Sequence, residues 1–170
     1  MAGMASKELK PNTELKELPK LLHRLTSLAD MKIGVLKGTG EHPNADHGQT
    51  IAEIAAYNEL GTTITAQSAF GPAEKVVIPA RSFLRSTMRE KRAALIKLIG
   101  VVSKKVVKKD ISPDEAFELI GLQLQSWVRK KIDEITYPPN ALSTRLQKGS
   151  SKPLVDTGTM RQSITYGKDG

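Results

Sequence analysis

The segment with the clearest chemical potential is Asp156-Thr157-Gly158, which follows the apolar pair Leu154-Val155. A hydrolase of the aspartic type presents its catalytic carboxylate in this way, and it needs two carboxylates that share one proton. One such segment would serve only in a homodimer, and it would need a long run of β structure after it. Two long helical patterns precede the segment instead, so a hydrolase that uses Asp156 stays a remote alternative.

A structural interpretation accounts for the same residues. Asp156 or Thr157 would cap a short helical turn, and Gly158 would allow a close approach of the backbone. Met160 and Ile164, four residues apart, would anchor the turn to the core. A final strand through residues 163–166 would follow it.

Other candidate chemistry is weak. Gly38 and Gly40 follow a predicted strand, but the pattern of a phosphate-binding loop is incomplete. His42, Asp46 and His47 are potential metal ligands, yet their spacing matches no ligand pattern, and solvated loop residues explain them. The chain contains no Cys, which excludes a thiolate nucleophile and a Cys-based zinc site. We therefore predict no catalytic residue, no cofactor and no metal, and we expect the protein not to be an enzyme.

Length and composition favour one soluble domain. A chain of 170 residues with 4% aromatic residues and many aliphatic ones suits helix packing with a modest sheet. We expect a flexible arm over residues 1–18 and a single domain over residues 19–170. No apolar run has the length of a membrane helix, and the start lacks the apolar middle of a signal peptide. We expect no membrane partner.

The net charge of +8 leaves two classes of partner open. An electropositive surface would attract nucleic acid or an acidic protein, and solvated lysines on polar helix faces would explain the same charge. Lys104-Lys105, Lys108-Lys109 and the run Arg129 to Lys131 would meet phosphates if they shared a face. A basic nucleic-acid-binding module is therefore the main alternative function.

The first half of the chain predicts short elements. A leucine pattern predicts a helix over residues 19–29, and alternation predicts a strand over residues 31–36. Thr50 and Glu53 form a capping box for a helix over residues 51–60, which Gly61 ends. We expect protruding loops at 38–49, at 62–75 (a loop or loose hairpin) and at 136–153. A brief β segment, residues 76–78, is stopped by Pro79.

The second half predicts two long amphipathic helices. Leu84, Met88, Leu95, Ile99, Val102 and Val106 keep helical spacing to about Lys109. Ser112 and Pro113 then start a helix whose apolar stripe includes Trp127, a packing anchor. The two helices should pair antiparallel. The predicted fold class is α+β, with a small, mostly antiparallel sheet packed against the two helices.

Three segments together resemble tailed-bacteriophage neck and tail-completion proteins, including minor tail morphogenesis families. They are AAYNELGT (residues 55–62), VIPARSFLRSTM (residues 77–88) and KPLVDTGTMRQSI (residues 152–164), with the proline-rich lead-in YPPNALSTRLQKGSSKP before the last. Leu60, Ser82 and Met160 depart from the family pattern, in which an aromatic residue, a proline and a leucine are usual. Many relatives also place the Thr-Gly-x-Leu piece before the Glu-aromatic-Gly-Thr piece, whereas here it comes last.

The resemblance implies a structural virion protein that forms a ring, which we expect to be a hexamer, and acts in tail completion or head–tail joining. It would be made in the host cytoplasm and located in the neck or tail of the virion. Its partners would be further copies of itself and neighbouring connector, tail-terminator or tail-tube proteins. The basic helix faces would meet either DNA in the lumen or an acidic partner ring.

The same resemblance assigns structural roles to particular residues. Asn58, Glu59 and Gly61 would set a turn, and Phe83 would dock the long helix. Arg81 and Arg85 would pair across an interface or with buried carboxylates. The complete set of expected structural and interface residues is Asn58, Glu59, Gly61, Pro79, Arg81, Phe83, Arg85, Asp156, Thr157, Gly158, Met160 and Ser163.

Overall fold

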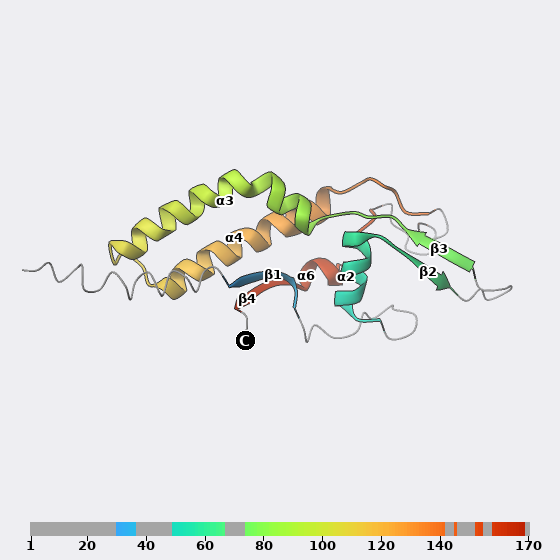
Figure 1. Cartoon of the computed structure of the whole chain (residues 1–170), viewed down its shortest axis with the longest axis horizontal. Helices are drawn as coiled ribbons and strands as arrows, with labels where there is room; N and C mark the ends of the chain where they lie inside the picture. The colour runs from blue at the N-terminus through green and yellow to red at the C-terminus, as the bar shows by residue number, and fades with distance from the viewer. Residues whose placement is uncertain are drawn as a thin grey trace, which may run out of the picture.

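Two long helices form the body of the protein. The computed structural model describes residues 30–36, 49–66, 74–141, 145, 152–154 and 158–168. Helix α3 (Leu84–Val107) and helix α4 (Pro113–Glu134) lie side by side as an antiparallel hairpin (Figure 1). Both predicted helices and their pairing are therefore confirmed. The predicted helix at 19–29 lies outside the described residues, as do the arm and most of the loop at 38–49.

The starts of the helices follow from capping chemistry. Ser112 accepts from the backbone N–H of Glu115, whose carboxylate accepts from the backbone N–H of Ser112, so α4 begins with a capping box. Helix α2 (Ile51–Leu60) begins with the same device, built from Thr50 and Glu53. In both cases two backbone donors that would otherwise lack partners are satisfied. The sequence located these two starts correctly.

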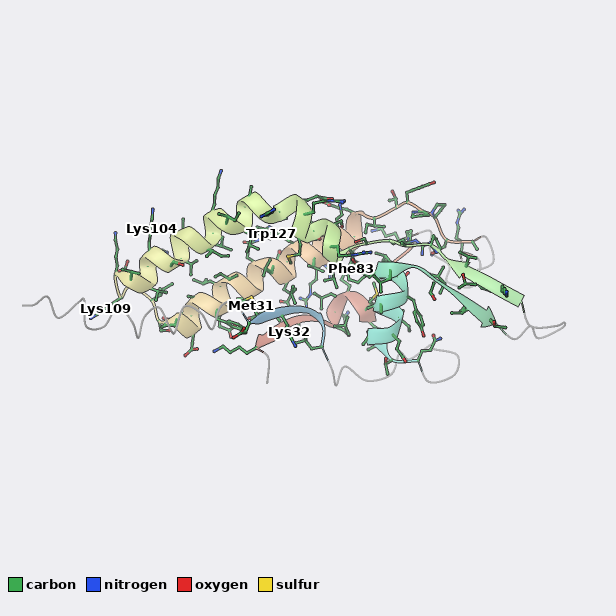
Figure 2. All side chains as sticks on the ribbon, in the orientation of Figure 1. Met31, Lys32, Phe83, Lys104, Lys109 and Trp127 are labelled. Carbon is green, nitrogen blue, oxygen red and sulfur yellow. The ribbon has the colours of Figure 1, made fainter. Side chains whose placement is uncertain are left out.

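Helix α4 is the central layer of the molecule. On one side it packs on α3, and on the other it packs on an antiparallel ribbon of strands β1 (Met31–Val35) and β4 (Ile164–Lys168). Trp127 contributes to the core shared by α3, α4 and β1, as predicted (Figure 2). At Gly121 the helix approaches β4 so closely that an added Cβ would lie 2.2 Å from Tyr166 Cδ2.

A second antiparallel ribbon stands apart from this core. Strands β2 (Thr62–Ala66) and β3 (Glu74–Ile78) pair with each other and extend beyond α2 at one end of the molecule (Figure 1). For the described residues 62–66 and 74–75, the hairpin alternative is thus correct and the loop alternative is wrong. The predicted single sheet is two separate ribbons, and β3 begins at Glu74 rather than Val76.

Two further expectations need correction. The short helix α6 (Thr159–Gln162) has Gly158 at its N-cap position, with φ 79°, so Asp156 or Thr157 does not occupy that position. Ile99, assigned to the buried stripe of α3, is 40% exposed. The buried face of α3 turns away from Ile99 because the partner helix covers only one side of α3.

In the described part of the chain, no helix has the length and apolar composition that a membrane span requires.

Candidate functional site

Glu59 caps the start of α3, a helix that begins 25 residues later in the sequence. Helix α3 begins after Phe83, whose side chain has no hydrogen-bond acceptor, so the first backbone donors need another partner. Glu59 Oε2 accepts from the backbone N–H of Phe83 at 2.7 Å and of Leu84 at 2.8 Å. Glu59 Oε1 accepts from the backbone N–H of Arg85 at 3.0 Å and from Ser82 Oγ at 2.7 Å.

The same carboxylate forms an ion pair with Arg85. Arg85 Nε lies 3.0 Å from Glu59 Oε1, and Arg85 Nη2 donates to the Glu59 backbone carbonyl. Burial opposes ionisation of Glu59, but the hydrogen bonds from Ser82, from the helix backbone and from Arg85 outweigh it. The pKa of Glu59 is therefore lowered from its usual value. Glu59 is therefore an ionised residue of α2 that binds the start of α3. The predicted pairing of Arg85 with a buried carboxylate is confirmed.

Arg81 connects the start of α3 to the segment that follows α4, by donating to two backbone carbonyls of that segment. Its Nε donates to the Pro138 carbonyl at 2.7 Å and its Nη2 to the Pro139 carbonyl at 3.0 Å. Asn58 Oδ1 accepts from Arg81 Nη1 at 3.4 Å. Burial lowers the pKa of the Arg81 guanidinium. Of the two alternatives for Arg81, pairing with a buried carboxylate is not found among the described residues, since the planar guanidinium instead holds the segment after α4; pairing across an interface stays a prediction.

Gly61 and Pro79 shape the passage between α2 and the hairpin. Gly61 has φ 73°, and an added Cβ would lie 2.8 Å from the backbone nitrogen of Ala80. Both the backbone angle and the close approach therefore require glycine. Pro79 follows β3 directly, and because it lacks a backbone donor it ends the strand as predicted.

The C-terminal segment with α6 and β4 packs against α2 and the start of α3. Met160 is 6% exposed and Ile164 is fully buried, which confirms both as anchors. Ser163 ends α6, where its Oγ donates to the Thr159 carbonyl at 2.9 Å. Asp156 and Thr157 lie outside the described residues. Described residues after Gly158 form α6 and β4, not a long β structure.

One hydrophobic core joins the three segments that carry the family resemblance. Phe83, fully buried, lies where α2, the start of α3 and α4 meet (Figure 2). The members of this core are Ile51, Ala55, Phe83, Val128, Ile132, Leu154, Met160 and Ile164. Ala55 belongs to the first segment, Phe83 to the second, and the last three to the third. Segments that are far apart in sequence thus form one structural unit, which we call the junction.

A shallow groove of ≈ 540 Å³ lies between α4 and α6. It is lined by Leu122, Gln125, Ser126, Arg129, Lys130, Asp133 and Arg161. Arg161 pairs with Asp133 at 2.9 Å, and Arg129 donates to the backbone carbonyls of Gln162 and Ile164. These charged side chains hold α6 against α4. The groove therefore has a structural explanation.

The basic clusters do not share a face. Lys104 lies on the outer side of α3 and points away from α4 (Figure 2). Lys131 is bound to Glu90 of α3 at 2.7 Å, near the opposite end of the helical hairpin. The condition set for a common phosphate-binding face is thus not met. Among the described residues, no group of three or more His, Cys, Asp or Glu side chains is placed to hold a metal ion.

The sequence pattern did not identify every residue of the junction. Ser82 was predicted only to depart from the family pattern, but its hydroxyl donates a hydrogen bond to Glu59. The backbone carbonyls of Pro138 and Pro139 accept hydrogen bonds from Arg81. The proline-rich composition of this segment was the only available signal.

We compared the chain with protein-family models, curated proteins and solved structures, and none of the three comparisons gave a match.

Proposed function

We propose that this protein is a structural component of a tailed-bacteriophage virion, which forms a ring at the neck or tail end in tail completion or head–tail joining. One observation carries the proposal. The three sequence segments that resemble such proteins lie in one core at the junction, although they come from residues 55–62, 77–88 and 152–164. A shared core is what a common structural unit requires, and unrelated chance resemblances would not be expected to pack together.

The β2–β3 hairpin supports an assembly role. Val77 is 69% exposed and Val76 is 40% exposed, and each strand of this two-stranded ribbon has one edge without a partner strand in the described residues. An isolated two-stranded ribbon is marginally stable in water. A neighbouring subunit in a ring would cover its apolar side chains and provide a partner for its free edge.

Removal of the coding sequence from the phage genome that carries it tests the proposal. Electron microscopy of lysates should show separate heads and tails in place of joined particles, and a plasmid copy should restore joining. The matched control is a plasmid copy with Lys91→Glu, an exposed substitution outside the junction and outside the β2–β3 hairpin. Normal yields of joined, infective particles without the gene would overturn the proposal.

The run of basic residues on α3 favours one alternative, a nucleic-acid-binding module. Residues 91–109 contain seven Lys or Arg and no acidic residue. This function predicts binding to DNA of unrelated sequences, with an affinity that falls steeply as salt rises. Fluorescence anisotropy with a labelled duplex, at several salt concentrations, separates it from the assembly role.

A further inference from the structure

The helical hairpin separates its charges at the turn between α3 and α4. The seven basic residues of 91–109 are followed by four acidic and no basic residues in 110–118. Within the described part of the chain, Lys97, Lys104 and Lys108 take part in no ion pair. One end of the molecule therefore presents a positive and a negative surface on neighbouring helices.

The positive surface is one side of α3. Its members recur at helical spacing and are Ile96, Gly100, Lys104, Val107 and Lys108, here named the α3 face. Ile96 is 60% exposed and Val107 is 50% exposed. At Gly100 an added Cβ would meet no atom within 4 Å, so the backbone is open to a close approach. The α3 face combines lysines, exposed apolar side chains and an exposed glycine.

The negative surface is the exposed side of α4. Its members are Asp114, Glu115, Glu118, Leu119 and Leu122, here named the α4 face. Leu119 is 46% exposed and Leu122 is 53% exposed. Asp114 is bound to Lys168, and Glu118 accepts from the Tyr166 hydroxyl. Since one cation accompanies three carboxylates, the α4 face keeps a net negative charge beside its two exposed leucines.

The complementary groups lie at matching heights along the hairpin. Because the helices are antiparallel, the contact between Glu90 and Lys131 fixes which residues are level. Counting from that contact, Lys104 is level with Glu118, Lys108 with Asp114, and Gly100 with Leu122, to within about one residue. A rotation about an axis parallel to the helices preserves height, so it can bring one copy's α3 face to another copy's α4 face in register.

We propose that the α3 face of one copy docks on the α4 face of a second copy. Leu122 packs over Gly100, and Lys104 and Lys108 meet Glu118 and Asp114. Because different surfaces meet, the contact is head-to-tail, and its repetition closes into a ring when the rotation divides a full turn. This inference rests on the proposed ring-forming function and identifies the surfaces that build the ring.

Charge exchange tests the contact. One variant carries Lys104→Glu and Lys108→Glu, and the other carries Asp114→Lys and Glu118→Lys. Each alone should self-associate about tenfold more weakly or worse than the unchanged protein in sedimentation velocity, because like charges then oppose each other. An equimolar mixture should regain assembly, since every contact in an alternating ring is again between opposite charges. Lys32→Glu with Lys91→Glu is the matched control for the lysine variant, because it makes the same change in net charge at exposed residues outside both faces and outside the β2–β3 hairpin.

Disulfide trapping provides a second test that does not depend on the charge variants folding. The chain has no Cys, so Gly100→Cys and Leu122→Cys introduce unique thiols. Under mild oxidation a mixture of the two single variants should form a disulfide-linked heterodimer faster than either variant links to itself. Equal linking in all three samples would overturn the head-to-tail arrangement.

The remaining outcomes separate this inference from the proposed function. If the mixture of charge variants stays dissociated, or if the control weakens assembly as strongly, the proposed contact is wrong. The same holds if the unchanged protein stays monomeric and the Gly100→Cys and Leu122→Cys variants form no mixed disulfide with each other. The particle-joining experiment judges the proposed function independently, because loss of joining without the gene would stand even if another surface forms the ring.

Discussion

At the scale of single residues, the junction depends on an ionised carboxylate that does the work of a helix cap. Glu59 accepts from the backbone N–H of the N-cap residue Phe83, from the first two backbone donors of α3, and from the side chains of Ser82 and Arg85. Its side chain is 8% exposed, whereas that of Arg85 is 65% exposed. We therefore expect Glu59 to contribute more to stability than Arg85. Solvent screens the charge of Arg85, whereas the backbone donors at the start of α3 have Glu59 as their acceptor.

We predict that Glu59→Ala lowers the free energy of unfolding by about 3 kcal/mol, because buried donors lose a charged acceptor. Arg85→Ala is the matched variant and should cost less than about 1 kcal/mol, as exposed ion pairs do. Urea denaturation followed by circular dichroism measures both. Equal costs for the two variants would contradict the role of Glu59 as the cap of α3.

The lowered pKa of Glu59 also predicts a pH dependence. A carboxyl whose pKa is lower in the folded state stabilises the fold fully above its unfolded value, near 4.5. That contribution is lost as pH falls through the folded pKa. The unfolding free energy should therefore decline below about pH 4.5. In Glu59→Gln its slope against pH should be smaller, by an amount that corresponds to up to about one bound proton. Denaturation at a series of pH values compares the two slopes.

At the scale of elements, α4 is the layer on which the other parts are assembled, and its glycine shows how tightly they fit. Gly121 lets α4 approach β4, where an added Cβ would lie 2.2 Å from the Tyr166 ring. Gly100 lies on the open side of α3, with nothing within 4 Å. Two helical glycines in one hairpin thus have opposite surroundings.

We predict opposite effects for the same substitution at these positions. Gly100→Ala should stabilise the protein by up to about 1 kcal/mol through helix propensity. Gly121→Ala should destabilise it by about 1–3 kcal/mol, because the methyl group forces Tyr166 and β4 outward. Thermal unfolding gives the sign of each change. Stabilisation by Gly121→Ala would mean that α4 and β4 pack less closely than described.

At the scale of the whole molecule, the buried residues and the exposed β2–β3 hairpin are located in different regions. The junction and the helical hairpin contain the buried residues, while the β2–β3 hairpin projects from one end. Val77→Asp should change the unfolding free energy by no more than about 0.5 kcal/mol, as expected for an exposed site. It should nevertheless reduce the yield of joined particles in the plasmid complementation assay. Unchanged joining would exclude this side of the hairpin from the assembly contacts.

Local sequence determined the elements whose signals are local. The capping boxes at Thr50 and Ser112, Pro113 at the first position of α4, and the apolar stripe with Trp127 located α2 and α4 because each depends on neighbours within one or two helical turns. The resemblance also selected Glu59, Phe83 and Met160, which are buried in the structure.

Only the tertiary structure decided what those residues contact. Glu59 caps a helix that begins 25 residues later, and Arg81 binds carbonyls more than 50 residues away. Ile99 fits the apolar spacing of α3 but is exposed, because spacing does not reveal which side a partner covers. The division of the predicted sheet into two ribbons likewise depends on strand pairing across long separations. Sequence determined the local elements and the charge separation of the helices, and the packing of distant segments determined the junction and the surfaces left free.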